Sequence, residues 1–88
     1  MEINNKLDKY IKLTESALKK VKEKKIKSRK ALELLKLAEC YYSDALHFKK
    51  KGDLVNAFAA INYAHAFLDA GVVLGLFKVK DNKLFMSD

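Results

Sequence analysis

Apolar residues recur at spacings of three and four along two successive segments of this chain. The first stripe consists of Ile3, Leu7, Tyr10, Ile11, Ala17, Leu18 and Val21. The second consists of Ala31, Leu34, Leu35, Ala38, Tyr41, Tyr42, Ala45 and Phe48. This spacing places apolar side chains on one face of a helix, with lysines and glutamates outside it. The pattern predicts helices over residues 3–23 and 28–51.

A third segment, residues 54–74, is apolar on almost every side. Such a helix is either a membrane span or the centre of a bundle. Asp69 in mid-segment would cost on the order of 3 kcal/mol in lipid, and the two amphipathic segments offer faces that can cover this helix. We therefore predict no membrane span but an all-α fold, a three-helix antiparallel bundle in which residues 54–74 are central.

Local signals mark the predicted helix ends. The hydroxyl of Ser28 can cap the second helix, and Asp53 can cap the third. Three consecutive lysines, residues 49–51, place positive charge at the negative end of the second helix, and Gly52 suits the position that follows it. The second and third helices therefore fold back on each other through a tight turn.

The C-terminal segment, residues 76–88, alternates apolar and polar residues around Asp81-Asn82. This pattern predicts a short extended tail or a hairpin. An isolated hairpin is marginal in water, so its apolar residues must pack on the bundle or on a partner. We expect the tail to pack mainly on its own bundle, over one end of the first and third helices.

Length and composition indicate a single small domain spanning residues 1–88. Half of the residues are apolar and there is no proline, which suits a helical bundle and argues against disorder. Cys40 is the only cysteine, so no internal disulfide can form and a reducing cytoplasm is the expected compartment. The polar N-terminal segment lacks the apolar core of a signal peptide.

The net charge of +7 resides entirely in the first third of the chain, because residues 1–30 hold 11 Lys and Arg against 4 Asp and Glu. Such a cluster either binds polyanions through counterion release or keeps a small protein in solution. The candidate polyanion-binding residues are Lys19, Lys20, Lys22, Lys24, Lys25, Lys27, Arg29 and Lys30.

Two resemblances follow from residues 38–85. Tyr41, Ala45, Phe48, Gly52 and Ala57 are similar to one tetratricopeptide unit, although an array needs about three copies. The segments Tyr63-Ala64, Leu68-Asp69-Ala70-Gly71 and Leu74-Gly75-Leu76 resemble a family of short archaeal proteins catalogued as domain of unknown function 357. This second resemblance implies a helical bundle from an archaeal cytoplasm and carries no catalytic residue.

Candidate chemistry is sparse. The turn at Gly52 should bring Cys40 near His65, which shares a helix face with Asp69, and nucleophilic catalysis uses such groups. A small buried cysteine and an ordinary contact between His65 and Asp69 explain the same residues. His47 and His65 form no recognised metal-binding spacing with the cysteine. We therefore expect no catalytic site, no metal and no cofactor.

The polar residues of the third helix form the other candidate site. Asp69 lies in an apolar helix, and a buried carboxylate needs a partner. The partner could be Lys36 or His65. We define a candidate buried polar site from Asp69, His65 and Tyr63.

Two functions remain open at this stage. Apolar surface on the third helix and the tail suits a small non-catalytic interaction or assembly protein, bound to an unknown protein partner or to a second copy of itself. The basic N-terminal third suits an RNA- or ribosome-associated protein, which would contact phosphates without reading the base sequence.

Overall fold

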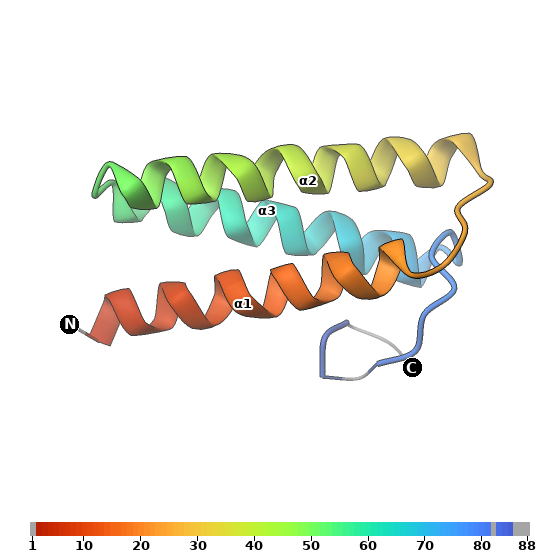
Figure 1. Cartoon of the computed structure of the whole chain (residues 1–88), viewed down its shortest axis with the longest axis horizontal. Coiled ribbons are helices and arrows are strands. Elements are labelled where there is room, and N and C mark those ends of the chain that lie inside the picture. The colour runs from red at the N-terminus through yellow and green to blue at the C-terminus, as the bar shows by residue number, and fades with distance from the viewer. Residues whose placement is uncertain (1, 82, 86–88) are drawn as a thin grey trace.

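The structure is a computed structural model that describes residues 2–81 and 83–85. It contains the helices α1 (Glu2–Lys22), α2 (Arg29–Lys50) and α3 (Leu54–Val73), and no strand occurs in the described ranges. Each helix begins and ends within one residue of the predicted bound. Successive helices run in opposite directions, and α3 packs against both α1 and α2 (Figure 1). The predicted all-α bundle is confirmed.

The capping signals read from the sequence are present at both helix starts. The Ser28 hydroxyl accepts a hydrogen bond from the backbone N–H of Ala31 at 3.3 Å, and the Asp53 carboxylate accepts one from Asn56 at 3.2 Å. These bonds satisfy backbone donors that the first turn of a helix leaves without an internal partner. They place the starts of α2 and α3.

Both α2 and α3 end in the same hydrogen-bonded motif. Gly52 and Gly75 adopt left-handed φ values of 78° and 74°, which a glycine reaches without steric cost. The next residue in each case donates back to the last turn, Asp53 to Phe48 at 2.9 Å and Leu76 to Gly71 at 2.8 Å. This is the Schellman arrangement, which turns the chain sharply at the end of a helix.

Alanines form the contact between α2 and α3. The side chains of Ala38, Ala45, Ala57 and Ala64 are all completely buried. Small side chains let two helices approach closely, and this contact agrees with the prediction that the second and third helices fold back on each other. The aromatic ring of Phe48 packs beside this contact.

Polar pairs join α1 to α2 along their length. Lys49 pairs with Asp8 near one end, and Lys22 pairs with Glu39 near the other. Between them the Tyr42 hydroxyl donates to Glu15 at 2.7 Å. Burial, this bond and the negative charge of Glu15 raise the pKa of Tyr42 to about 12.

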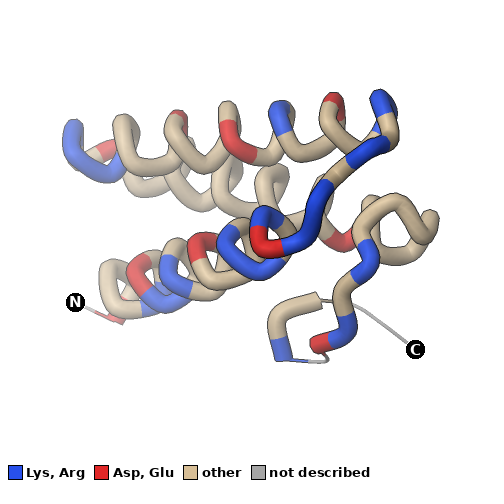
Figure 2. The backbone as a smooth tube through the Cα atoms, turned by 45° about the vertical axis from the view of Figure 1, so that its right-hand side comes forward, with Lys and Arg blue, Asp and Glu red and all other residues tan. Residues whose placement is uncertain are grey.

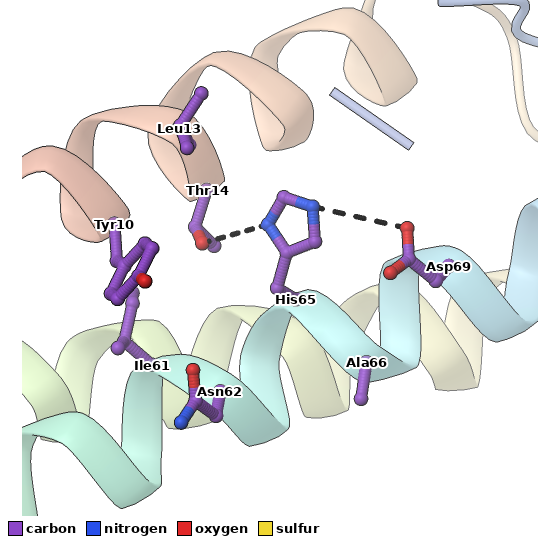
Figure 3. Close-up of a pocket in the computed structure, with 8 residues that line it drawn as sticks. All are labelled: Tyr10, Leu13, Thr14, Ile61, Asn62, His65, Ala66 and Asp69. Carbon is purple, nitrogen blue, oxygen red and sulfur yellow. Dashed lines mark hydrogen bonds and ion pairs between the residues drawn. The ribbon is translucent and has the colours of Figure 1, made fainter. Parts of the chain in front are cut away.

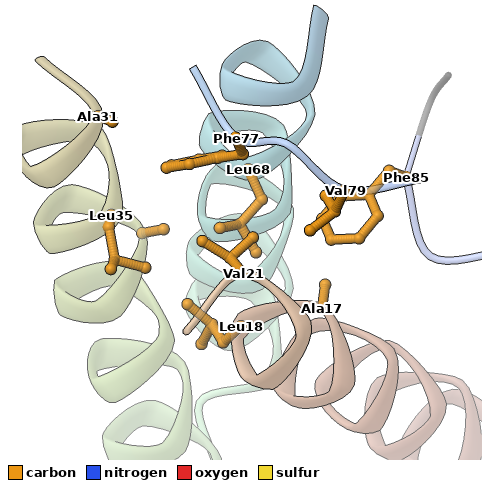
Figure 4. Close-up of a cluster of buried hydrophobic side chains, with 10 residues drawn as sticks. Ala17, Leu18, Val21, Ala31, Leu35, Leu68, Phe77, Val79 and Phe85 are labelled. Atoms are coloured by element: carbon orange, nitrogen blue, oxygen red, sulfur yellow. The ribbon is translucent and has the colours of Figure 1, made fainter. Parts of the chain in front are cut away.

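The tail packs on its own bundle. Phe77, Val79 and Phe85 are buried, and they join Ala17, Leu68 and other residues in one apolar cluster at the linker end of the molecule (Figure 4). The tail thus completes the core between α1 and α3, as expected from its apolar composition.

The hairpin alternative is wrong for the part of the tail that the structure describes. Asp81 forms a turn instead of a strand end: its carboxylate accepts from the Lys83 N–H at 3.0 Å, and its carbonyl accepts from the Phe85 N–H at 2.9 Å. An aspartate that bonds nearby backbone groups competes with strand pairing. Asn82, the other residue of the predicted turn, lies outside the described residues.

Candidate functional site

His65 of α3 lies at the centre of a pocket between α1 and α3. The pocket has a volume of about 320 Å³ (Figure 3). Its lining residues are Tyr10, Leu13, Thr14, Ile61, Asn62, His65, Ala66 and Asp69. Ile61, His65 and Asp69 follow one another at intervals of four. The helical repeat therefore places these three lining residues on the same side of α3.

The hydrogen bonds of His65 define its tautomer. The Leu84 carbonyl can only accept, so the Nε2 atom of His65 carries a hydrogen and donates to it at 2.5 Å. In the neutral ring Nδ1 is then the acceptor, and the Thr14 hydroxyl lies 2.9 Å from it. His65 therefore connects three segments that are distant in sequence: α1, α3 and the tail.

Thr14 lies between Ile11 and Ala17 at the spacing of the apolar stripe of α1, and sequence reasoning missed its role. Its side chain is only 1% exposed. A buried hydroxyl without a partner would destabilise the fold, and the bond to His65 removes that penalty. A hydroxyl inside an apolar stripe is the signal that could have revealed this contact.

Asp69 is half-buried beside this histidine. Its Oδ1 atom lies 3.8 Å from the Nε2 atom of His65 (Figure 3). The predicted proximity of these two side chains is therefore present. Lys36, the alternative partner, is exposed on α2. Both ring nitrogens of His65 already form hydrogen bonds, one to α1 and one to the tail. The histidine therefore holds α1, α3 and the tail together.

Two expectations about this region are wrong. Tyr63 is exposed, since it lies about 200° around the helix from His65. Cys40 is exposed on α2 and lies about 200° around that helix from Ala38, which contacts α3. The ring nitrogens of His65 bond α1 and the tail instead. The structure thus does not assemble the Cys40, His65 and Asp69 constellation.

The basic residues of the first third form an almost continuous run from the end of α1 through the linker to the start of α2 (Figure 2). Three of the eight candidate residues contact acidic side chains. The Nζ atom of Lys20 lies 3.9 Å from Oδ2 of Asp81, and the Nε atom of Arg29 lies 3.8 Å from Oε1 of Glu33. Lys22 pairs with Glu39. Lys19 and Lys30 are exposed on the ends of their helices. The positive charge is thus partly balanced along α1 and α2.

The remaining three candidates lie together around a second pocket. Lys24, Lys25 and Lys27 belong to the linker, and Lys78 of the tail joins them. The pocket measures about 410 Å³ and lies between residues 24–28 and 75–78. Sequence reasoning missed Lys78, because more than 50 residues separate it from the linker and only the packing of the tail brings it there.

The outer side of α3 is exposed and apolar. Val55 is 81% exposed, Val73 is 67% exposed and Tyr63 is 57% exposed. Beside this side, the ring of Tyr41 stacks on Tyr63 and Phe67, with ring centroids 5.4 and 5.6 Å apart. The helices α1 and α2 cover two sides of α3 and leave the third open.

Within residues 2–81 and 83–85, no three His, Cys, Asp or Glu side chains come close enough to hold a metal ion. None of the helices in this described part combines the length and hydropathy of a membrane span.

Comparisons with known proteins place the chain in a family. Searches of curated proteins and of solved structures give no significant match. The family described as "Protein of unknown function (DUF357)" matches residues 9–77, which include all of α2 and α3 and most of α1. The resemblance read from Leu68-Asp69-Ala70-Gly71 and the residues around it is therefore correct, and the chain belongs to the DUF357 family.

Proposed function

We propose that this protein is a non-catalytic assembly protein that pairs with a second copy of itself through the outer side of α3. The observation that carries the proposal is an exposed row of apolar and uncharged residues, which only the half-buried Asp69 interrupts. Its members are Val55, Ala59, Asn62, Ala66 and Val73, and we call this row the α3 seam. It extends over most of a helix that is about 30 Å long.

The spacing of the α3 seam suits a second helix. From Val55 to Ala66 its residues recur at intervals of four and three, and Asp69 continues this spacing to Val73. Such a repeat keeps one stripe facing a partner helix. Ala59 and Ala66 in the middle leave room for a close approach. In an antiparallel pair, Val55 of one copy would lie near Val73 of the other, so one stripe would serve both copies.

Charge also favours self-association at this place. The positive charge of the chain is concentrated on residues 1–30, whereas the α3 seam has none. Because α3 contains no lysine or arginine, two copies that meet through it bring no cations of this helix into contact. The contact also removes the exposed valine side chains from water, which is favourable. The stacked rings of Tyr41, Tyr63 and Phe67 would flank the contact.

Sedimentation from micromolar to millimolar concentrations tests this assembly. We expect the natural chain to become dimeric as its concentration rises. Ala66→Glu should keep it monomeric, because the new carboxylates would be buried against each other. Ser43→Glu introduces the same side chain at an exposed site of α2 and should leave the dimer intact. A natural chain that stays monomeric at millimolar concentration, or an Ala66→Glu chain that still dimerises, would contradict the proposal.

RNA binding through the basic third is the second candidate function. It is supported by the exposure of Lys24, Lys25 and Lys27, which lie around one pocket with Lys78. Removing Lys22, Lys24, Lys25 and Lys27 should reduce the slope of log K against log salt by about 3. Absence of RNA binding at low salt would leave these lysines as a solubilising surface.

For its place in the cell we propose the cytoplasm of an archaeon. The single thiol suits a reducing compartment, and the short archaeal proteins that the chain resembles suggest the source. Fractionation of native cells, with detection of the chain by antibody, checks this location.

A further inference from the structure

We propose that the pocket at the linker end of the bundle binds a phosphorylated ligand that carries a flat apolar group, the chemistry of a nucleotide. The pocket lies between the linker and the turn that follows α3, and these two segments meet at one end of the molecule (Figure 1). Its volume of about 410 Å³ falls within the range usual for small-molecule sites. We call it the linker pocket.

Charge around the linker pocket favours an anion with more than one negative charge. Lys24, Lys25, Lys27 and Lys78 line it, and none of its described lining residues is acidic. Glu23 precedes this group in the chain but does not line the pocket. Four lysines around one cavity concentrate positive charge there, and a phosphate dianion would offset it.

The floor of the linker pocket is apolar. Ile26 and Leu76 line it and are half-buried, and Phe77 is buried beneath them. A hydrated inorganic ion would leave this floor in contact with water. A ligand that joins a phosphate to a nucleobase can place its charge among the lysines and its flat group on Ile26 and Leu76.

Both walls of the linker pocket are held in place by the fold. On one side Ser28 caps α2. On the other side Gly75 closes the end of α3, and the backbone N–H of Phe77 donates to the Gly71 carbonyl at 3.1 Å. A site that is already formed loses little conformational freedom when it binds.

This site is separate from the α3 seam, so it stands whether or not the chain dimerises. Two kinds of molecule join a phosphate to a nucleobase in this way: a free mononucleotide and the phosphorylated 5′ end of an RNA strand. RNA strands with and without a 5′ phosphate separate them.

Titration followed by amide NMR tests the linker pocket in the full chain. Adenosine 5′-monophosphate should shift amide signals of residues 24–28 and 75–78 and leave those of the α2–α3 turn unchanged. Inorganic phosphate and adenosine should each bind at least about tenfold more weakly, because each supplies one half of the ligand. Equal affinity for the nucleotide and for inorganic phosphate, or shifts spread over all basic segments, would overturn the proposal.

Matched charge variants separate a site from general attraction. Lys25→Gln with Lys78→Gln should weaken nucleotide binding roughly fivefold for each lysine, the change that about 1 kcal/mol of ion pairing produces. Lys50→Gln with Lys51→Gln removes the same charge at the opposite end of the bundle and should have little effect. An equal loss of nucleotide affinity in both double variants would show that binding depends only on the net charge of the protein. This result would overturn the proposal.

Short RNA strands identify the source of the ligand. If a 5′-phosphorylated strand binds more tightly than the mononucleotide and than the same strand with a 5′ hydroxyl, the site recognises an RNA end. If the mononucleotide binds at least as tightly as both strands, the ligand is a free nucleotide. A strand that binds equally well with and without its 5′ phosphate, and is unaffected by Lys25→Gln with Lys78→Gln, would show sequence-independent contact elsewhere and contradict the assignment.

Discussion

At the scale of single residues, Gly71 shows how close packing can demand a glycine inside a helix. A Cβ atom added there would lie 2.2 Å from two ring atoms of Phe77. The ring is buried between α2 and α3 and has little room to move (Figure 4). The absence of a side chain at residue 71 therefore lets the tail enter the core.

The effect of Gly71→Ala follows from this contact. Alanine favours a helix by about 1 kcal/mol over glycine. Overpacking costs about 1–3 kcal/mol and should win, because the clash involves a buried ring. Urea unfolding should therefore show a less stable protein. Phe77→Leu in the same chain should recover part of the loss, and a fully additive double mutant would contradict this account.

Tyr42 makes stability depend on alkaline pH. Its pKa in the folded chain is raised to about 12 by burial and by Glu15, against a usual value of 10.0. The neutral tyrosine is therefore favoured by folding, and its contribution is complete below pH 10 and is lost as the pH rises towards 12. The natural chain should lose more stability over that range than Tyr42→Phe does.

Chemical unfolding at a series of pH values measures this difference. Comparison of the two chains cancels the titration of the lysines, which both share. Tyr10→Phe is a matched control, since it removes the hydroxyl of a tyrosine that is 41% exposed. Identical pH dependence of the natural chain and of Tyr42→Phe would show that the bond to Glu15 does not form.

At the scale of helices, the contact between α2 and α3 depends on small residues. Ala57→Leu adds three carbon atoms at a position with no free surface and should cost about 1–3 kcal/mol. Ser43→Leu is the control, on α2 and outside the α3 seam. Its side chain is exposed, so stability should change by less than about 0.5 kcal/mol. Thermal unfolding that ranks the two variants in the reverse order would contradict the helix pairing.

At the scale of the whole molecule, the tail acts as part of the core. Truncation after Gly75 removes Phe77, Val79 and Phe85, and each large apolar side chain contributes roughly 1.5–3 kcal/mol when buried. A small domain has only about 5–15 kcal/mol in total. We therefore expect the truncated chain to be largely unfolded by circular dichroism.

The concentration dependence of this loss distinguishes folding from assembly. Because the tail packs on its own bundle, truncation should destabilise the chain equally at every concentration. Lys80→Ser, at an exposed site in the same tail, should change little. A truncated chain that is as stable as the intact one would assign the tail to another partner.

Much of this fold follows from local patterns. The spacing of apolar residues predicted the first two helices, and the continuous apolar segment predicted the third. Ser28, Gly52 and Asp53 marked where two of the helices begin and one ends. These signals act within a few residues, since a cap or a left-handed glycine bonds its own helix end. The alanine faces of α2 and α3 were predictable for a similar reason, because a tight turn joins them and sets their register.

Contacts between distant segments were decided only by the tertiary structure. Thr14 and His65 are 51 residues apart, and their hydrogen bond depends on how α1 is rotated against α3. The periodicity of a helix identifies its apolar face but not the partner atom across it. The same limit explains why Lys78 was not grouped with the linker lysines. Tyr63 is different, because helical periodicity alone places it about 200° around α3 from His65. The close approach of Phe77 to Gly71 brings the tail into the core, and this packing places Lys78 at the linker pocket.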